Sequence, residues 1–263
     1  MSQAFSDFHL RFPRLRPPQA VTADMAAHTA VAVEGYEERV LLLGVTPALS
    51  GIGRELVAVD RSPKMIALVW PGDDERRRVV EADWRWMDPG GDFSAVVGDG
   101  SLNCVAYPEG YEQVLARLTV VLRRPARFAV RFFVTPDPCE SVEALGEAVV
   151  AGQVESIHAL KWRLAMAIVA EQRSVNIAAA DILARFDALF PDRAELMRRT
   201  GWTMDEIGTL DFYRGSSDVL SFPTVEQIRA VVPPGFSELR LMKSGDYDLS
   251  ERCPVVVMDW TGG

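Results

Sequence analysis

Cysteine and histidine are both scarce in this sequence. Its 263 residues contain three of each, and none stands in a Cys-x-x-Cys pair or in the paired cysteine and histidine spacing of a zinc site. They are Cys104, Cys139, Cys253, His9, His28 and His158. The spacing predicts reduced cysteines in a cytoplasmic protein and indicates no metal site.

Long apolar runs are absent as well. No run approaches the roughly 20 residues that span a bilayer, and residues 1–20 lack the apolar segment of a secretory signal. Aromatic and arginine side chains mix in this stretch, which favours an arm packed across a surface over a disordered tail. We expect no membrane segment and no export.

Basic residues are fewer than acidic ones in this chain. The chain has 28 Lys and Arg against 37 Asp and Glu, a net charge of −9, so it has little field to attract nucleic acid as its main partner. The apolar share of 48% and the charged share of 25% are ordinary for a globular protein. A chain of this length can bury a sizeable core, as one domain with an insertion or as two domains.

The most informative stretch is a strand, a turn and a second strand. Arg39–Gly44 is a continuous apolar run that ends on a glycine, which is typical of a parallel strand buried on both faces. Thr46 is a candidate helix cap and Pro47 a candidate first helical residue. Because a second apolar strand, Glu55–Val59, then ends on Asp60, this order predicts the first half of a doubly wound nucleotide-binding sheet.

The turn argues against a dinucleotide ligand. A pyrophosphate needs several backbone N–H groups and room beside glycines. Pro47 removes one donor, and Gly51 and Gly53 precede a strand instead of following one. A ligand without phosphate, made of an adenine, a ribose and a zwitterionic amino-acid tail, fits the turn better.

Two later strands also end in polar residues. Arg77–Ala82 reads as a third strand and is followed by Asp83 and Trp84. Phe93–Val97 reads as a fourth and leads into Gly98–Asn103, which includes Asp99. Ligands of open α/β sheets bind at the carboxyl ends of the strands, so these residues are candidates for a binding site.

The rest of the chain divides into helices and three strands. Helical periodicity is strongest at residues 111–122, with a shorter run at 22–35, and Phe128–Val134 reads as a fifth strand. The alternation of strands and helices then stops, and helical patterns cover residues 141–151, 156–171, 177–190, 192–200, 203–209 and 224–232. Two final strands are expected at Phe236–Lys243 and Pro254–Trp260.

The order of these features resembles the class I S-adenosylmethionine-dependent methyltransferases. The resemblance lies in the turn Leu43-Gly44-Val45-Thr46-Pro47 and in Asp60, Asp83 and Asp99 at successive strand ends. It implies a doubly wound, Rossmann-like α/β fold: a mainly parallel seven-stranded sheet with a helical insertion between the fifth and sixth strands. The implied parts are an N-terminal arm and helix (1–35), a cofactor-binding core (36–138), a helical cap (139–235) and a C-terminal strand pair (236–263).

The resemblance also implies a role for each site residue in holding S-adenosylmethionine. The turn would lie at the methionine end, the acid after the second strand would bind the ribose hydroxyls, and the later residues would surround the adenine and the reacting centre. The implied cofactor-binding residues are Gly44, Val45, Thr46, Pro47, Asp60, Arg61, Met65, Asp83, Trp84, Asp99, Gly100 and Ser101.

The reaction implied is methylation of an oxygen or nitrogen of a small-molecule acceptor by in-line displacement. Such a transfer depends on alignment in a dry pocket and needs a general base only when the acceptor must lose a proton early. His28, His158 and Tyr213 are candidate bases, each equally compatible with a structural role, and the catalytic residue stays unassigned.

Three interpretations remain open from the sequence. A small-molecule methyltransferase is favoured over a nicotinamide-dependent oxidoreductase because of Pro47 and the missing glycines. A non-catalytic relative that binds the cofactor or a partner is the third. The insertion at 139–235 is either a substrate cap or a packing surface, which leaves a homodimer possible.

Overall fold

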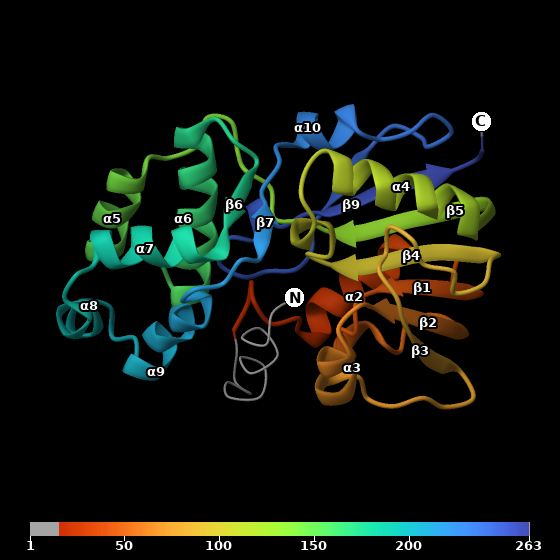
Figure 1. Ribbon diagram of the computed structural model, residues 1–263, viewed down its shortest axis with the longest axis horizontal. Helices are drawn as coiled ribbons and strands as arrows, with labels where there is room; N and C mark the ends of the chain where they lie inside the picture. The colour runs from red at the N-terminus through yellow and green to blue at the C-terminus, as the bar shows by residue number, and fades with distance from the viewer. Residues whose placement is uncertain (1–15, 263) are drawn as a thin grey trace.

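The computed structural model describes residues 16–262, and its centre is a seven-stranded sheet (Figure 1). The strands are β1 (Arg39–Leu43), β2 (Glu55–Asp60), β3 (Arg77–Glu81), β4 (Phe93–Asp99), β5 (Leu122–Arg131), β8 (Arg240–Met242) and β9 (Val255–Trp260). Their order across the sheet is β3-β2-β1-β4-β5-β9-β8. The pairs among β1 to β5 are parallel, whereas β9 runs antiparallel to both β5 and β8. The predicted mainly parallel sheet, interrupted after its fifth strand, is confirmed.

The sheet is buried on both faces, as the continuous apolar strands require. Along β1, Leu41 and Leu43 pack in one cluster with α4 (Glu109–Val121), while Val40 and Leu42 pack in another. The second cluster includes residues of α2 (Ala23–Ala32) and α3 (Pro63–Val69). Successive side chains of a strand point to opposite faces, so one apolar run supplies two cores.

Local signals set where these helices begin. The hydroxyl of Thr22 accepts a hydrogen bond from the backbone N–H of Met25 at 3.2 Å, and α2 follows. Ser62 caps α3 in the same way, with Pro63 at the first helical position. After β1 the chain forms a single 3₁₀ turn, η1 (Pro47–Leu49), which Pro47 opens as expected; Thr46 stands at the cap position, but its side chain makes no capping hydrogen bond.

The insertion after β5 forms a body with its own apolar core at the carboxyl end of the sheet. Figure 1 shows the arrowheads of β4 and β5 pointing toward it. Its helices are α5 (Val142–Val150), α6 (Ile157–Gln172), α7 (Ala179–Leu189), α8 (Arg193–Thr200), α9 (Met204–Ile207), the 3₁₀ segment η3 (Gly208–Tyr213) and α10 (Val225–Ala230). The last of these, α10, packs through Ile228 on the core of the main sheet instead of the insertion's own core.

Three sequence-based boundaries differ from the structure. Residues 177–178 were expected to begin a helix, but they belong to strand β6 (Asn176–Ala178), which pairs with β7 (Val219–Ser221) in a small antiparallel sheet. β5 begins at Leu122, because that residue pairs with Phe93 beyond a register shift. β8 is shorter than expected, and ahead of it Phe236 makes an isolated bridge to Trp260.

The predicted N-terminal arm falls partly on residues 1–15, which lie outside the described part of the chain. From Arg16 onward a short turn leads past Gln19 into α2, between the sheet and the insertion (Figure 1). Among residues 16–262, no helix combines the length and the apolar character that a bilayer crossing needs.

Candidate functional site

A cavity of about 610 Å³ lies where the carboxyl edge of the sheet meets the insertion. Its walls come from the strand ends, from the insertion and from the segment Gln19–Val21 ahead of α2. Eleven of the twelve residues expected to hold a cofactor line it: Gly44, Val45, Thr46, Pro47, Asp60, Arg61, Met65, Trp84, Asp99, Gly100 and Ser101. The fold therefore brings residues from the ends of four strands, β1 to β4, to one space.

The turn after β1 presents bare backbone to the cavity. Gly44 has φ +106°, a conformation that side chains rarely adopt, and its N–H donates to the carbonyl of Val59 at 2.8 Å. A Cβ at this position would lie 3.9 Å from Cζ2 of Trp84 and 4.0 Å from Oδ2 of Asp60. Both distances are ordinary contacts, so it is the positive φ, not the space, that favours glycine at this turn.

The Asp60 carboxylate is 1% exposed. Oδ1 accepts a hydrogen bond from the backbone N–H of Ser62 at 2.8 Å. Burial raises the pKa of Asp60, although the backbone donors beside it act in the opposite direction. A carboxylate has acceptor capacity for several donors, and Asp60 lines the cavity, so it can also accept a hydrogen bond from a ligand hydroxyl there.

The ring of Trp84 is fixed beside Asp60. Its indole N–H donates to the carbonyl of Val59 at 2.6 Å, which sets the orientation of the ring. Ser101 is held in a comparable way, since its hydroxyl donates to the carbonyl of Leu43 at 2.6 Å. The Trp84 bond joins the segment after β3 to β2, and the Ser101 bond joins the segment after β4 to β1.

Asp83 is the expected residue that does not line the cavity. Its carboxylate accepts from Arg85 Nε at 2.9 Å and from Arg85 Nη2 at 2.6 Å, and these hydrogen bonds lower its pKa to about 2. Arg61, which does line the cavity, places Nη1 3.6 Å from Asp83 Oδ2. Asp83 therefore contacts the site through Arg61.

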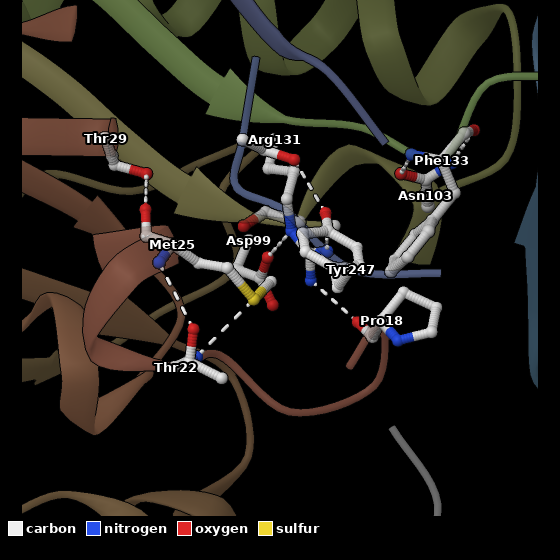
Figure 2. Close-up of polar contacts among 12 residues, drawn as sticks. Pro18, Thr22, Met25, Thr29, Asp99, Asn103, Arg131, Phe133 and Tyr247 are labelled. Atoms are coloured by element: carbon white, nitrogen blue, oxygen red, sulfur yellow. Dashed lines mark hydrogen bonds and ion pairs between the residues drawn. The ribbon is translucent and has the colours of Figure 1, made fainter. Parts of the chain in front are cut away.

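Asp99, after β4, is paired with a buried arginine (Figure 2). The Arg131 side chain is 2% exposed and also donates to the Tyr247 hydroxyl and to the carbonyl of Pro18, both at 2.9 Å. This network joins β4, β5, the loop before β9 and the segment ahead of α2. It fixes Asp99 at the cavity and ties down the chain that passes over it.

The insertion contributes an aromatic wall with a lysine in it. Trp162 stacks on Phe133, with ring centroids 4.7 Å apart, and Phe222 lies 5.7 Å from Trp162. Lys161 is 4% exposed, and its ammonium donates to the side-chain oxygen of Gln19. Burial lowers the pKa of Lys161 to about 7.

The three candidate bases lie in different surroundings. His28 is half-exposed on α2 and bonds to the carbonyl of Asp24 at 2.9 Å, away from the cavity lining. His158 is buried on α6 outside the lining, and burial lowers its pKa to about 3, so it stays neutral near pH 7. Tyr213 lines the cavity, and burial raises the pKa of its hydroxyl. Within residues 16–262, no group of three or more His, Cys, Asp or Glu side chains is arranged to hold a metal ion.

Sequence reasoning missed Lys161 and Trp162. The signal was available, because Lys161 interrupts the apolar helix that runs from Ile157 to Val169. A lysine on an otherwise buried helix is unusual and marks either a pairing or a site. The sequence around Gln19 gave no such signal, because only the path of the segment ahead of α2 in the folded chain brings this residue to the cavity.

Known proteins resemble this chain in structure alone. No protein-family model matches it, and no curated protein does. A candidate Zn-dependent alcohol dehydrogenase from Rhodobacter sphaeroides is 11% identical, with full coverage of both chains and a TM-score of 0.59. N-methyltransferase NodS from Bradyrhizobium japonicum WM9, solved with S-adenosyl-L-homocysteine, is 7% identical over the whole of both chains, with a TM-score of 0.51. A candidate methyltransferase of Haloferax volcanii, solved with the Trm112 activator, is 10% identical over 91% of this chain and 90% of its own, with a TM-score of 0.50.

The seven-stranded, mostly parallel sheet with its flanking helices matches the fold of the methyltransferase neighbours. This chain has the class I methyltransferase fold. Within that fold, the cavity lies at the carboxyl ends of β1 to β4, and the insertion closes its other side. At these identities the likeness defines the architecture, and the function has to be argued from the side chains.

Proposed function

We propose that this protein is an S-adenosylmethionine-dependent methyltransferase that acts on a small-molecule acceptor. The observation that carries the proposal is the buried Asp60 carboxylate beside the bare backbone of Gly44, in a cavity of the class I methyltransferase fold. NodS, which shares the fold, was solved with S-adenosyl-L-homocysteine, the product that methyl transfer leaves behind.

The residues present fit the three parts of this cofactor. The glycine turn from Gly44 to Pro47 would receive the methionine end, and Asp60 would accept hydrogen bonds from the ribose hydroxyls. Arg61, Met65 and Trp84 would surround the adenine. Asp83, expected from the sequence to bind the adenine amino group, is instead proposed to position Arg61, because its carboxylate is already bonded to Arg85.

Bound S-adenosylmethionine supplies an electrophilic methyl group on a sulfonium. The protein's own contribution is to align the acceptor and exclude water. Phe133, Trp162 and Phe222 supply apolar walls for that purpose. The volume of about 610 Å³ lies within the range of about 300–1,000 Å³ usual for small-ligand pockets, which supports a small acceptor over a macromolecule.

A nicotinamide-dependent oxidoreductase is the competing function, and the dehydrogenase neighbour has the same architecture. Pro47 opens η1, so the turn that would face a pyrophosphate lacks one N–H donor. A methionine tail makes fewer demands on that turn than a pyrophosphate does. This difference favours the methyltransferase.

The test is turnover. Purified protein incubated with S-adenosylmethionine and a panel of phenols, carboxylic acids and amines should release S-adenosylhomocysteine, detected by mass spectrometry, when a suitable acceptor is present. Release should stop when the acceptor is omitted. If the protein binds S-adenosylhomocysteine but no acceptor in a broad panel is methylated, the chain is a non-catalytic cofactor-binding relative.

A further inference from the structure

The acceptor side of the cavity carries one feature that methyl transfer in general does not require. Lys161 places its ammonium on the cavity wall, 4.1 Å from the ring centroid of Trp162 and 5.5 Å from that of Tyr213. Among the described lining residues the basic ones are Arg61, on the sheet side, and Lys161, on the insertion side. The insertion therefore brings a buried basic group, which also donates to the side chain of Gln19, to the cavity wall.

A second polar group adjoins this lysine. The indole N–H of Trp162 is buried and has no hydrogen-bond acceptor among residues 16–262, although the ring lines the cavity. A buried donor without an acceptor is uncommon in folded proteins. The Lys161 ammonium is therefore the donor that this wall offers to a ligand, and a cationic N–H donor suits an oxygen anion.

The surrounding side chains are flat. Phe133 and Trp162 stack with their planes 27° apart, and Phe222 and Tyr213 complete this part of the wall. Aromatic rings pack well against another planar ring in offset or tilted contacts. A planar ligand with a charged end would use both the rings and the lysine.

We propose that the acceptor is an aromatic acid, whose ring packs among Phe133, Trp162 and Phe222 and whose carboxylate binds the Lys161 ammonium. This assignment of the substrate class rests on the proposed methyltransferase function, since it deepens that site. The contact is electrostatic and involves no covalent step. Lys161 acts here as a binding residue for the acceptor.

The low pKa of Lys161 gives the proposal a specific signature. Burial disfavours the ammonium and brings its pKa to about 7, while a bound carboxylate would favour the ammonium and raise that pKa. The titratable or charged groups near the lysine include His158 on the same helix, which Arg16 also influences, and Tyr213 from η3, which Asp218 influences. His158 stays neutral and Tyr213 stays protonated near pH 8, so proton uptake on binding at pH 8 would report on Lys161.

The first measurement compares three ring compounds of similar size by calorimetry at pH 8. The probes are 4-hydroxybenzoate, its neutral methyl ester and the cation tyramine, each titrated into the full chain with and without S-adenosylhomocysteine. We expect 4-hydroxybenzoate to bind at least tenfold tighter than the ester. Heats measured in buffers of different ionisation enthalpy should show uptake of a fraction of a proton for the acid and none for the ester.

The second measurement uses variants. Lys161→Met should abolish both the preference for the acid and the proton uptake, whereas Lys161→Arg should keep most of the preference. Lys243→Met, at a lysine whose side chain is 60% exposed, is the matched control and should behave as wild type. Equal binding of acid and ester by the wild type, or an unchanged preference in Lys161→Met, would overturn the proposal. Tighter binding of tyramine would overturn it too, and would point to Asp218 on the same side of the cavity.

These titrations keep the two proposals apart. Failure to bind S-adenosylhomocysteine would refute the proposed function, whatever the ring compounds do. Binding of S-adenosylhomocysteine with no preference for the acid would leave the methyltransferase in place and remove the aromatic acid.

Discussion

The Asp60 carboxylate lies directly beside Gly44, so that a Cβ on this glycine would come within 4.0 Å of Oδ2. Gly44 directly follows β1 and Asp60 is the last residue of β2, and the N–H of Gly44 donates to the carbonyl of Val59. A carboxylate held over bare backbone can reach a ligand that rests on the turn. The first two predictions concern this pair.

Asp60→Asn should weaken the binding of S-adenosylhomocysteine by about 10- to 150-fold, because a charge-assisted hydrogen bond is worth roughly 1.5–3 kcal/mol. Calorimetric titration measures the change. Asp246→Asn, at an acid whose side chain is 94% exposed, is the control and should bind as wild type. An Asp60→Asn protein that stays folded and keeps wild-type affinity would remove Asp60 from the site.

Gly44→Ala should cost about 1–3 kcal/mol of folding free energy, the usual cost of a side chain in a disfavoured backbone conformation, because φ at this position is +106°. Relief of that strain would move the turn and weaken cofactor binding. Gly51→Ala is the matched control, since a Cβ there meets nothing within 4 Å. Urea unfolding curves of the two variants should differ, and similar stabilities would show that the turn tolerates a side chain.

The Arg131–Asp99 pair should behave as a coupled unit. Removing one partner of a buried ion pair leaves an uncompensated charge and costs about 3–5 kcal/mol. Arg131→Met and Asp99→Asn should each destabilise the fold, while the double variant should lose clearly less than the sum of the two. A double-mutant cycle from denaturant unfolding measures this coupling. Additive losses would mean that the two side chains act independently.

Because of Lys161, the free energy of unfolding should rise with pH, whereas a lysine held in a salt bridge would make it fall. The pKa of Lys161 is about 7 in the folded chain and higher in the unfolded chain, so the unfolded state binds more protons between these values. Folding is therefore penalised fully below pH 7, and the penalty falls as pH rises toward 10. Relative to Lys161→Met, the wild type should gain up to about 1.4 kcal/mol of unfolding free energy per pH unit in this window. If the unfolding free energies of the wild type and of Lys161→Met changed in parallel from pH 7 to 10, the lowered pKa of Lys161 would be contradicted.

Much of the sheet could be predicted from the sequence because buried parallel strands are continuous apolar runs bounded by turn residues. The acids after such runs fall at one edge, which placed Asp60 and Asp99 correctly at the cavity wall. The pattern could not show that Asp83 would bond to Arg85, since that depends on side-chain geometry two residues away. The strand Asn176–Ala178 was missed because its pairing partner lies more than forty residues later, at Val219–Ser221.

The cavity wall formed by the insertion was harder to predict, because it too depends on contacts between residues far apart in the sequence. Lys161 and Trp162 meet Gln19 and Phe133 only through tertiary packing, and a helical period does not reveal which face closes a cavity. The cytoplasmic location, the homodimer and methylation at oxygen or nitrogen stay predictions, and the catalytic base stays unassigned. Each needs a measurement on the protein itself.

The most direct test of the account is a paired calorimetric titration of wild-type protein with S-adenosylhomocysteine and with NAD. The turn at Pro47 lacks the donors that a pyrophosphate needs, and Asp60 is placed for a ribose, so S-adenosylhomocysteine should bind with micromolar or tighter affinity. NAD should bind at least a hundredfold more weakly. The methyltransferase assignment would be contradicted if NAD bound more tightly than S-adenosylhomocysteine, or if NAD saturated the protein while S-adenosylhomocysteine was present.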